Sequence, residues 1–405
     1  MKTKQHISIF GYGVTTKPLA KHIKNAVFYD DNCKETYAGV DGSFVRPSHE
    51  FNADTSDLEI TSPGIPPSNR LTEQAKNLIS EYDFFAQTPP FKIWISGTNG
   101  KTTTTQMMQH LLADKGSVAG GNIGTALADL DQNAKIWILE TSSFTMHYTN
   151  RAAPNIYVLL PLSPDHLSWH GSMQEYIADK LKPLSKMKST DIAIIPDIYK
   201  NRPTDAKVFT FANEEDIAKT FEINTNHVNF KGAFLADALL AMAVDKLLFN
   251  RVDYKKMNSF TLDPHRQEEL HDNLGRLWVN DTKATNLDAT IAALKRYKDH
   301  YIHLILGGDD KGVDLSELFE FLKDLNLKIY AIGTNKDKLI TLAQNYHVES
   351  LKCKNLDNAI VNIDKNLQKN EVALLSPAAS SLDEFSSYAQ RGNEFKQKVS
   401  LLYNI

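Results

Sequence analysis

The chain has 405 residues, 42% of them hydrophobic and 23% charged, with a formal net charge of −4. This composition is typical of a globular protein with more than one domain. The slight negative charge argues against a general nucleic-acid binder, and no apolar run reaches the roughly 20 residues that cross a bilayer. Two distant cysteines, Cys33 and Cys353, and the lack of a signal-peptide pattern predict a cytoplasmic protein.

Short apolar runs alternate with segments of helical periodicity, which predicts an α/β fold with mostly parallel sheets. A Pro-containing linker at residues 87–90 and a second break at 261–266 divide the chain into three domains, at 1–88, 89–262 and 263–405. A long helix is expected over 234–249. The expected strands are 6–10, 26–29, 92–96, 136–140, 156–160, 193–196, 277–280, 303–306, 328–332 and 371–375.

The first strand runs into Gly11-Tyr-Gly13 and then into a helical segment. A glycine turn at a helix start can bind a diphosphate through backbone N–H groups, although core packing alone also explains such a turn. The full G-x-G-x-x-G pattern of NAD-binding proteins is not present, because Thr16 and Lys17 follow instead of the third glycine.

The segment from Lys92 to Thr105 carries the strongest chemical signal. An apolar strand enters a loop with Gly97 and Gly100, and Lys101 and Thr102 then open a helix. This order favours a phosphate-binding loop in which the lysine contacts the β- and γ-phosphates and the threonine binds Mg²⁺. The usual pattern has a glycine where this chain has Ile95, so an ordinary strand–turn–helix junction is the alternative.

Three polar residues follow predicted strands or lie on glycine-containing loops downstream. Glu140 ends a strand and is a candidate Mg²⁺ ligand, with a helix cap as the alternative. His166 follows the next strand and is a candidate metal ligand or a structural histidine. Asn122 lies in Gly120-Gly-Asn-Ile-Gly124, a loop that could face the phosphates.

Taken together, these segments resemble the Mur ligases, the ATP-dependent amide ligases of peptidoglycan precursor synthesis. The resemblance covers nearly the whole chain. The segments that carry it are Gly97-Thr-Asn-Gly-Lys-Thr-Thr103, Gly121-Asn-Ile-Gly124, Glu140-Thr-Ser-Ser-Phe144, Asp165-His166, His265-Arg266 and Asn280-Asp-Thr-Lys-Ala-Thr-Asn286.

Further segments are similar to the members of this family that add D-glutamate to UDP-N-acetylmuramoyl-L-alanine. They include Gly307-Gly-Asp-Asp-Lys-Gly312, residues 375–385 and Gln390-Arg-Gly-Asn-Glu-Phe395. The resemblance implies a Rossmann-like uridine-nucleotide domain, a central P-loop ATPase-type domain and a Rossmann-like C-terminal domain. It also implies ATP and D-glutamate as substrates, an acyl-phosphate intermediate, two Mg²⁺ sites and a monomer.

The resemblance assigns roles to individual residues. Lys101, His166 and Lys180 are implied in catalysis, with Lys180 N-carboxylated to a carbamate; from the residues alone a solvated helix lysine is the alternative. The implied ATP-binding residues are Gly97, Thr98, Asn99, Gly100, Lys101, Thr102, Thr103, Arg266 and Asp281, and the metal-binding residues are Thr102, Glu140, His166 and Lys180. The implied UDP-substrate residues are Val14, Thr15, Asp30, Ser62, Gly64, Asn122 and Ser142, and the D-glutamate residues are Lys283, Thr285, Lys311, Ser381, Leu382 and Tyr388.

The chain departs from the family at one segment. A G-x-H-N-x-x-N segment of the family is replaced by Lys231-Gly-Ala-Phe-Leu-Ala-Asp237, and Asp237 is expected to stand in for one of its contacts. This departure is the one feature that favours an alternative function, a non-catalytic nucleotide-binding regulator. A second alternative is a folylpolyglutamate-synthase-like ligase, which would share the central and third domains and would not need the first 88 residues.

Overall fold

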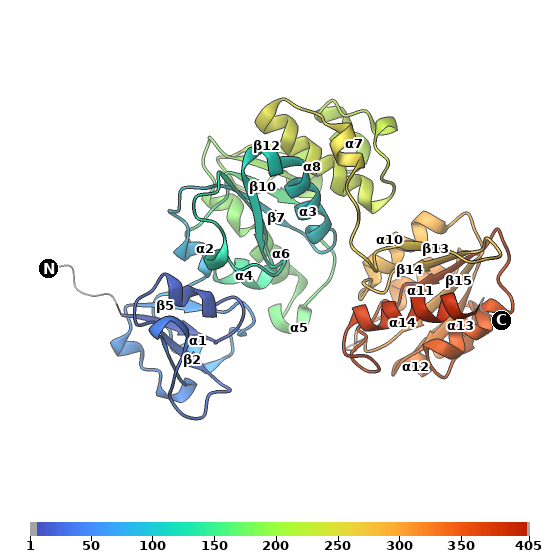
Figure 1. Cartoon of the computed structure of the whole chain (residues 1–405), viewed down its shortest axis with the longest axis horizontal. Helices are drawn as coiled ribbons and strands as arrows, with labels where there is room; N and C mark the ends of the chain where they lie inside the picture. The colour runs from blue at the N-terminus through green and yellow to red at the C-terminus, as the bar shows by residue number, and fades with distance from the viewer. Residues whose placement is uncertain (1–5, 311, 403–405) are drawn as a thin grey trace. The chain divides into compact units, whose positions relative to one another are not determined.

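The computed structural model describes residues 6–310 and 312–402. It contains three six-stranded sheets that follow one another along the chain (Figure 1). Contacts divide the chain into two compact units. One comprises residues up to 230 with 234–260, and the other comprises 231–233 with the residues from 261 onward. The first two sheets lie in the first unit and the third sheet lies in the second.

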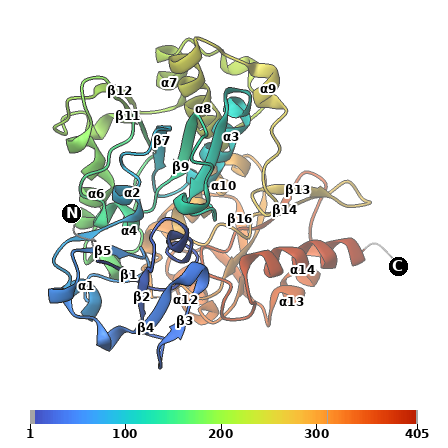
Figure 2. The ribbon, with the colours of Figure 1, turned by 60° about the vertical axis from the view of Figure 1, so that its left-hand side comes forward.

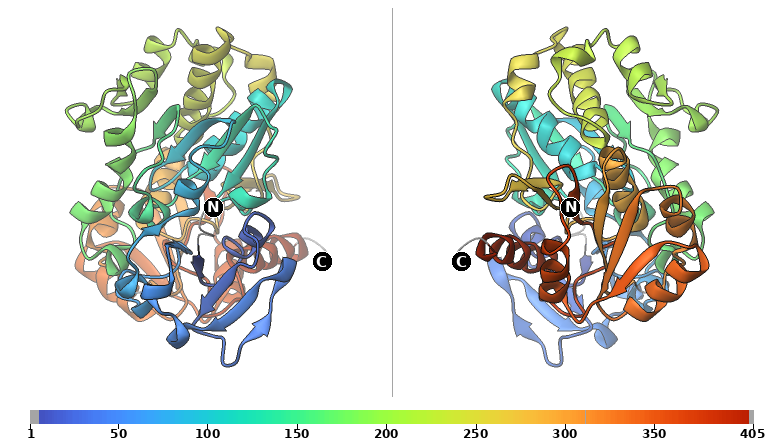
Figure 3. Two further views of the ribbon diagram at one scale, coloured as in Figure 1. Left: turned by 90° about the vertical axis from the view of Figure 1, so that its left-hand side faces the viewer. Right: turned by 90° about the vertical axis from the view of Figure 1, so that its right-hand side faces the viewer.

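The first sheet has the strand order β3-β4-β2-β1-β5-β6, and every pair is parallel except β3 with β4. Its strands are blue in Figure 3 and are connected mostly by short segments. The connection between β1 and β2 contains a 3₁₀ helix over Lys17–Lys21, with Pro18 in its first turn. The strands are β1 (Ile7–Phe10), β2 (Val27–Asp30), β3 (Tyr37–Ala38), β4 (Phe44–Pro47), β5 (Leu58–Thr61) and β6 (Leu78–Ile79), and the helices are α1 (Arg70–Gln74) and α2 (Glu81–Phe84).

The second sheet is entirely parallel, in the order β12-β11-β10-β7-β9-β8. Helices α3 and α8 lie side by side on it, as Figures 1 and 2 show. The strands are β7 (Phe91–Ser96), β8 (Ser117–Gly121), β9 (Ile136–Glu140), β10 (Ile156–Leu159), β11 (Ile192–Pro196) and β12 (Lys207–Phe211). The helices are α3 (Lys101–Leu112), α4 (Ser143–Tyr148), α5 (Leu167–His170), α6 (Met173–Leu181), α7 (Glu214–Thr220), α8 (Ala233–Phe249) and α9 (Tyr254–Asn258).

One hydrophobic core joins the first two sheets. Ile9 and Phe28 of the first sheet belong to the same buried cluster as Trp94 and Trp137 of the second. Tyr82 of α2 packs edge-on against Trp94, with 4.9 Å between ring centroids. Burial of each such large side chain contributes about 2–3 kcal/mol, so this shared core holds the two sheets in one unit.

The third sheet has the order β13-β14-β18-β15-β16-β17, with β13 antiparallel to β14 and the other pairs parallel. Along β15, Leu304 faces a core that includes α10, α11 and α12, whereas Ile305 faces a core that includes α13 and α14. Helices therefore cover both faces. The strands are β13 (Glu268–His271), β14 (Leu277–Asn280), β15 (Ile302–Gly307), β16 (Leu327–Ile332), β17 (Glu349–Lys352) and β18 (Val372–Leu375). The helices are α10 (Leu287–Tyr297), α11 (Ser316–Leu322), α12 (Lys336–Asn345), α13 (Leu356–Asp364) and α14 (Tyr388–Leu401).

The predicted α/β class with mostly parallel sheets is confirmed, and each of the ten expected strands is present within one or two residues. The long helix expected over 234–249 is α8. The two domain boundaries, and with them the three domains, stay predictions. Within the described part of the chain, no helix is long and apolar enough to cross a membrane.

Candidate active site

The loop between β7 and α3 lies at the carboxyl end of a strand in the middle of the second sheet. Gly97 has φ +149°, and a Cβ there would lie 2.5 Å from the Cβ of Leu160. Gly100 has φ +82° and caps the start of α3. The Lys101 Nζ donates to the carbonyl oxygens of Gly97 (3.0 Å) and Thr98 (2.6 Å). Glycine is therefore required at both positions, and the lysine lies over the loop.

Thr98 is buried and holds the loop to its neighbours. Its Oγ1 lies 2.8 Å from the hydroxyl of Tyr176 and 3.1 Å from the carbonyl oxygen of Ser163, and it accepts from the Ser163 N–H at 3.0 Å. The side chain predicted to bind ATP thus fixes the shape of the loop, and any contact of Thr98 with a nucleotide would come from its backbone.

Glu140 ends β9, the strand beside β7, so its carboxylate lies at the same sheet edge as the loop. The residue is buried, and its Oε1 accepts from the Asn122 amide nitrogen at 2.7 Å. Within the described part of the chain, Oε2 is buried and has no hydrogen-bond partner. A buried carboxylate oxygen without a donor fits a hard cation, so Glu140 suits Mg²⁺, with Thr102 in the first turn of α3 as the other candidate. Asn122, predicted to contact the UDP substrate, here orients Glu140.

Lys180 is the buried lysine of α6. Its Nζ donates to the Gly97 carbonyl oxygen at 2.8 Å and lies 4.9 Å from the centre of the Tyr176 ring. Lys101 donates to the same carbonyl oxygen, so the two predicted catalytic lysines meet at one loop residue. Burial, and secondly the charge of Lys101, lower the pKa of Lys180 well below its usual value. The alternative of a solvated helix lysine is therefore wrong.

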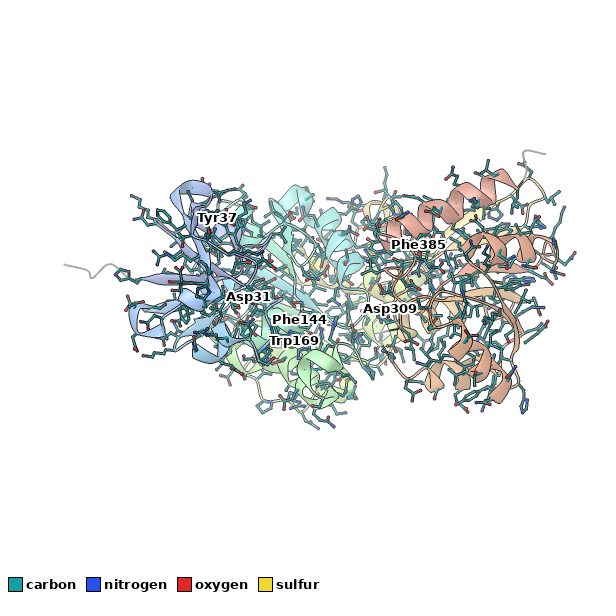
Figure 4. The ribbon with its side chains drawn as sticks, turned by 90° about the horizontal axis from the view of Figure 1, so that it is seen from below. Asp31, Tyr37, Phe144, Trp169, Asp309 and Phe385 are labelled. Atoms are coloured by element: carbon teal, nitrogen blue, oxygen red, sulfur yellow. The ribbon has the colours of Figure 1, made fainter. Side chains whose placement is uncertain are left out.

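His166 lies at the start of α5 in a left-handed conformation, with φ 52°. It is exposed, and its Nε2 lies 3.4 Å from an oxygen of Asp165. The centroid of the Phe144 ring lies 4.6 Å from that of the His166 imidazole and 4.7 Å from that of the Trp169 ring. Phe144 and Trp169 are labelled in Figure 4. Ser142, predicted to contact the UDP substrate, caps α4 by accepting from the Thr145 N–H at 3.1 Å. The metal role of His166 stays a prediction.

Asp237 of α8 lies against the phosphate loop. Its Oδ1 accepts from the Thr104 hydroxyl at 2.9 Å, and a Cβ on Gly100 would lie 2.5 Å from that same oxygen. Asp237, which was expected to replace one contact of the family's G-x-H-N-x-x-N segment, therefore lies beside the phosphate loop. Its role there is to hold α8 onto the first turn of α3.

In the first sheet, the glycine turn, Asp30 and Ser62 come together at the carboxyl ends of β1, β2 and β5. The Tyr12 N–H donates to Asp30 Oδ2 at 2.7 Å, and a Cβ on Gly11 would lie 3.2 Å from the Ser62 Cβ. Val14 is 86% exposed, so the turn lies at the surface. Thr15 and Gly64 lie on the same loops. These five of the seven predicted UDP-substrate residues thus lie at one edge of the first sheet, where parallel sheets place their ligands, whereas Asn122 and Ser142 follow strands of the second sheet.

In the second unit, Asp281 follows β14. It is buried, and its carboxylate accepts from the Ser376 hydroxyl at 2.8 Å and from the Gln267 N–H at 3.1 Å. Burial raises the pKa of Asp281 to about 7. The Nε of Arg266 is buried and, among the described residues, has no hydrogen-bond partner. The predicted ATP contacts of these two residues stay predictions.

Arg391 of α14 is a residue that the sequence interpretation missed. It is buried, and its guanidinium donates to the Thr282 hydroxyl (2.8 Å), to the Thr282 carbonyl oxygen (3.1 Å) and to the Ala379 carbonyl oxygen (3.1 Å). A Cβ on Gly308 would lie 3.2 Å from it. One side chain thus holds the loops after β14, β15 and β18. The sequence signal for Arg391 was its place in the segment Gln390–Phe395, which resembles the family.

The residues predicted to bind D-glutamate that the structure describes lie on the first and third of these loops and at the start of α14. Lys283 Nζ lies 5.3 Å from the centre of the Tyr388 ring, and Leu382 is 66% exposed. Ser381 is buried and accepts the Phe385 N–H through its carbonyl oxygen at 2.8 Å. Thr285 is exposed on the first of the loops. Lys311 lies outside the described residues.

The fold and this set of residues define a P-loop nucleotide-binding protein with a candidate metal carboxylate beside the loop. Residues 95–239 match the model of the Mur ligase middle domain. The UDP-N-acetylmuramoylalanine–D-glutamate ligase of Campylobacter jejuni strain 81-176 is 52% identical over 398 residues, which cover 97% of this chain and 99% of the relative. The chain belongs to the Mur ligase family, in the group of these D-glutamate ligases.

Two further comparisons agree. The ligase of the same name from Helicobacter pylori strain 26695 is 44% identical over 417 residues, with 97% of this chain and 99% of the relative covered. The crystal structure of MurF ligase from Thermotoga maritima in complex with ADP aligns with a TM-score of 0.59 over 98% of this chain and 99% of that chain. Its sequence identity is 16%, so it shows the shared fold alone. The predicted family and ligase class are confirmed.

Proposed function

We propose that this chain joins D-glutamate to the alanine carboxylate of UDP-N-acetylmuramoyl-L-alanine with the use of ATP, in peptidoglycan precursor synthesis. The observation that carries the proposal is the phosphate loop with Lys101, Lys180 and Glu140 around it, in a chain 52% identical to a ligase of that name. Both alternatives lose support. The first 88 residues, which a folylpolyglutamate-synthase-like ligase would not need, match along with the rest of the chain. A non-catalytic nucleotide binder needs neither the buried Lys180 nor the buried Glu140.

The first chemical step joins two anionic groups. An oxygen of the alanine carboxylate attacks the γ-phosphorus of ATP, an O–P bond forms, and ADP leaves. Lys101 and the N–H groups at the start of α3 neutralise the β- and γ-phosphates, because a cation and a helix N-terminus both favour negative charge. Positioning and charge neutralisation supply most of the rate enhancement in such a reaction.

The second step forms the amide bond. The neutral amine of D-glutamate attacks the acyl carbon, a C–N bond forms, and phosphate leaves while the amine proton passes to solvent. We propose that Lys283, Thr285, Lys311, Ser381, Leu382 and Tyr388 bind D-glutamate, because lysines complement its two carboxylates. The Arg391 guanidinium would fix the loops that carry these residues.

We propose Mg²⁺ at Glu140 and Thr102, and a second Mg²⁺ near His166 and a carbamate on Lys180. A bound Mg²⁺ would supply Lewis-acid neutralisation of phosphate charge. The lowered pKa of Lys180 gives the neutral amine that carbamate formation needs. In that reaction the neutral Nζ bonds to the carbon of CO₂ and releases one proton to solvent, so a buried neutral amine becomes an anion. We further propose a cytoplasmic monomer, which sedimentation at assay concentrations would test.

The direct test compares Lys101→Ala with Lys135→Ala, a matched change at an exposed lysine outside the site. Amide product is measured by chromatography after incubation with UDP-N-acetylmuramoyl-L-alanine, D-glutamate, ATP and Mg²⁺. We expect Lys101→Ala to lose at least about 100-fold in kcat, because a cation on the transferred phosphoryl group is lost, while Lys135→Ala keeps wild-type activity. Ligation by folded Lys101→Ala at the wild-type rate would overturn the phosphate-loop assignment.

A further inference from the structure

Two histidines and an aspartate to which the proposed ligase reaction assigns no role meet between α4, α5 and α6. The Nδ1 of His147 and the Nδ1 of His170 each lie 3.0 Å from the same oxygen, Oδ2 of Asp179. One candidate ligand atom from each of the three residues lies within 4.8 Å of the others. Two neutral imidazoles and one carboxylate form a donor set that divalent transition metals bind.

The buried histidine has the support that metal-binding histidines commonly have. The His170 side chain is fully shielded from solvent, and its other ring nitrogen, Nε2, lies 2.9 Å from the Ser143 hydroxyl. A hydrogen bond at the second ring nitrogen fixes the tautomer and the ring plane, so that Nδ1 is directed at Asp179.

The cluster opens on one side. The His147 side chain is 36% exposed, whereas that of Asp179 is 12% exposed. A cavity of about 460 Å³ adjoins all three residues and is also lined by Pro66, Pro67, Ser68, Trp169, Gly171 and Glu175. A metal at the cluster would therefore have room for a fourth ligand, either water or the Glu175 carboxylate.

We propose that His147, His170 and Asp179 bind one Zn²⁺ ion, at a site separate from the Mg²⁺ ligands of the ligase reaction. Zn²⁺ fits because it accepts nitrogen and oxygen ligands in a tetrahedron, whereas Mg²⁺ prefers six oxygens. The competing account is a hydrogen-bonded triad with no metal, in which both Nδ1–H groups donate to Asp179.

The site would stabilise the helices that carry the catalytic residues. Asp179 directly precedes Lys180 on α6, and the Phe144 ring stacks on His170 with 5.6 Å between centroids and lies 4.6 Å from the ring of His166. A metal that links α4, α5 and α6 adds binding free energy to the folded state only. Zn²⁺ should therefore raise the melting temperature of the protein.

The test uses the full chain without an affinity tag, treated with a chelator and then dialysed. Co²⁺ is titrated first, because tetrahedral Co²⁺ gives intense visible absorption bands, and Zn²⁺ is then used to displace it. His147→Gln and Asp179→Asn remove one ligand each, and His49→Ala changes an exposed histidine away from the cluster. Circular dichroism checks that each variant is folded.

We expect one Co²⁺ per chain with tetrahedral bands in the wild type and in His49→Ala, displaced by one equivalent of Zn²⁺. The affinity should fall at least tenfold in His147→Gln and in Asp179→Asn, and Zn²⁺ should raise the melting temperature only where it binds. Wild-type protein that shows no stoichiometric Co²⁺ band would overturn the proposal and leave the hydrogen-bonded triad. Equal affinity in all four folded proteins would also overturn it.

Discussion

At the scale of single residues, burial changes the chemistry of Lys180 most. A lysine on a short helix among other lysines suggests a solvated cation, yet this side chain is buried and donates to Gly97 and to the Ser96 hydroxyl. Burial favours the neutral amine, which is the form that reacts with CO₂. The family resemblance identified this residue from the sequence; the residue pattern alone did not.

We predict that Lys180→Ala reduces kcat by at least about 100-fold, because the variant cannot form the anionic carbamate proposed at this position. Added acetate or formate should restore part of the activity, since a short carboxylate can occupy the space of the deleted side chain. Phosphate release would be measured against carboxylate concentration, with Lys188→Ala as a control at an exposed lysine. Full activity of Lys180→Ala without added carboxylate would contradict the carbamate assignment.

Glu81 gives a prediction on stability and pH. It is buried in α2, its Oε2 has no hydrogen-bond partner among the described residues, and burial raises its pKa from 4.5 to about 8. Between pH 4.5 and about pH 8, Glu81 therefore stays protonated in the folded state and is ionised in the unfolded state. The free energy of unfolding should therefore decrease as pH rises through this range.

Glu81→Gln lacks the ionisable group, so its stability relative to the wild type should increase with pH, by roughly 2–4 kcal/mol across that interval. Thermal unfolding of both proteins at about pH 5 and about pH 8.5 measures the difference. Glu73→Gln, at an exposed glutamate of α1, is the control and should show no such trend. A pH-independent difference between Glu81→Gln and the wild type would show that Glu81 is ionised in the folded state.

At the scale of elements, α14 shows how one helix fixes a site made of loops. Arg391 binds carbonyl and hydroxyl oxygens of loops that are far apart in the sequence, and burial lowers its pKa to about 10. The next residue must be glycine, because a Cβ at Gly392 would lie 2.3 Å from the His265 Nδ1. The Arg-Gly pair therefore positions the loops.

We predict that Arg391→Lys raises the KM for D-glutamate about tenfold with a smaller change in kcat. A lysine ammonium cannot reproduce the set of directed hydrogen bonds that the planar guanidinium makes to the loops. Initial rates at varied D-glutamate give both constants. Gln397→Ala, at an exposed position of the same helix, should behave as the wild type. An unchanged KM for D-glutamate in Arg391→Lys would remove the positioning role.

The sequence predicted most of the inner strands and missed the edge strands of all three sheets, and it also missed β4 and β5 inside the first sheet. Apolar runs such as 156–160 are long and continuous, and they became central strands. β8 was missed because its five residues end in Gly120 and Gly121, which have low strand propensity. β13 was missed because its half-exposed residues carry charges. The His147, His170 and Asp179 cluster could not be predicted, since only tertiary packing brings its three helices together.

At the scale of the whole molecule, each of the three sheets places some of its predicted binding residues at the carboxyl ends of strands. Gly11 and Asp30 do so in the first sheet, Gly97 and Glu140 in the second, and Asp281 in the third. Parallel strands bring loops that are distant in the sequence to one edge, so chain order alone could predict these groupings. The contacts within each group, such as Asn122 with Glu140, required the structure.

The central claim, ligation of D-glutamate by the full chain, is tested most directly by phosphate release from ATP in the presence of Mg²⁺ and UDP-N-acetylmuramoyl-L-alanine. Four reactions are compared, with D-glutamate, L-glutamate, L-lysine or no amino acid. We predict stoichiometric phosphate release with D-glutamate alone. The claim is contradicted if folded protein that binds ATP releases no phosphate with any amino acid, or releases it equally with all of them.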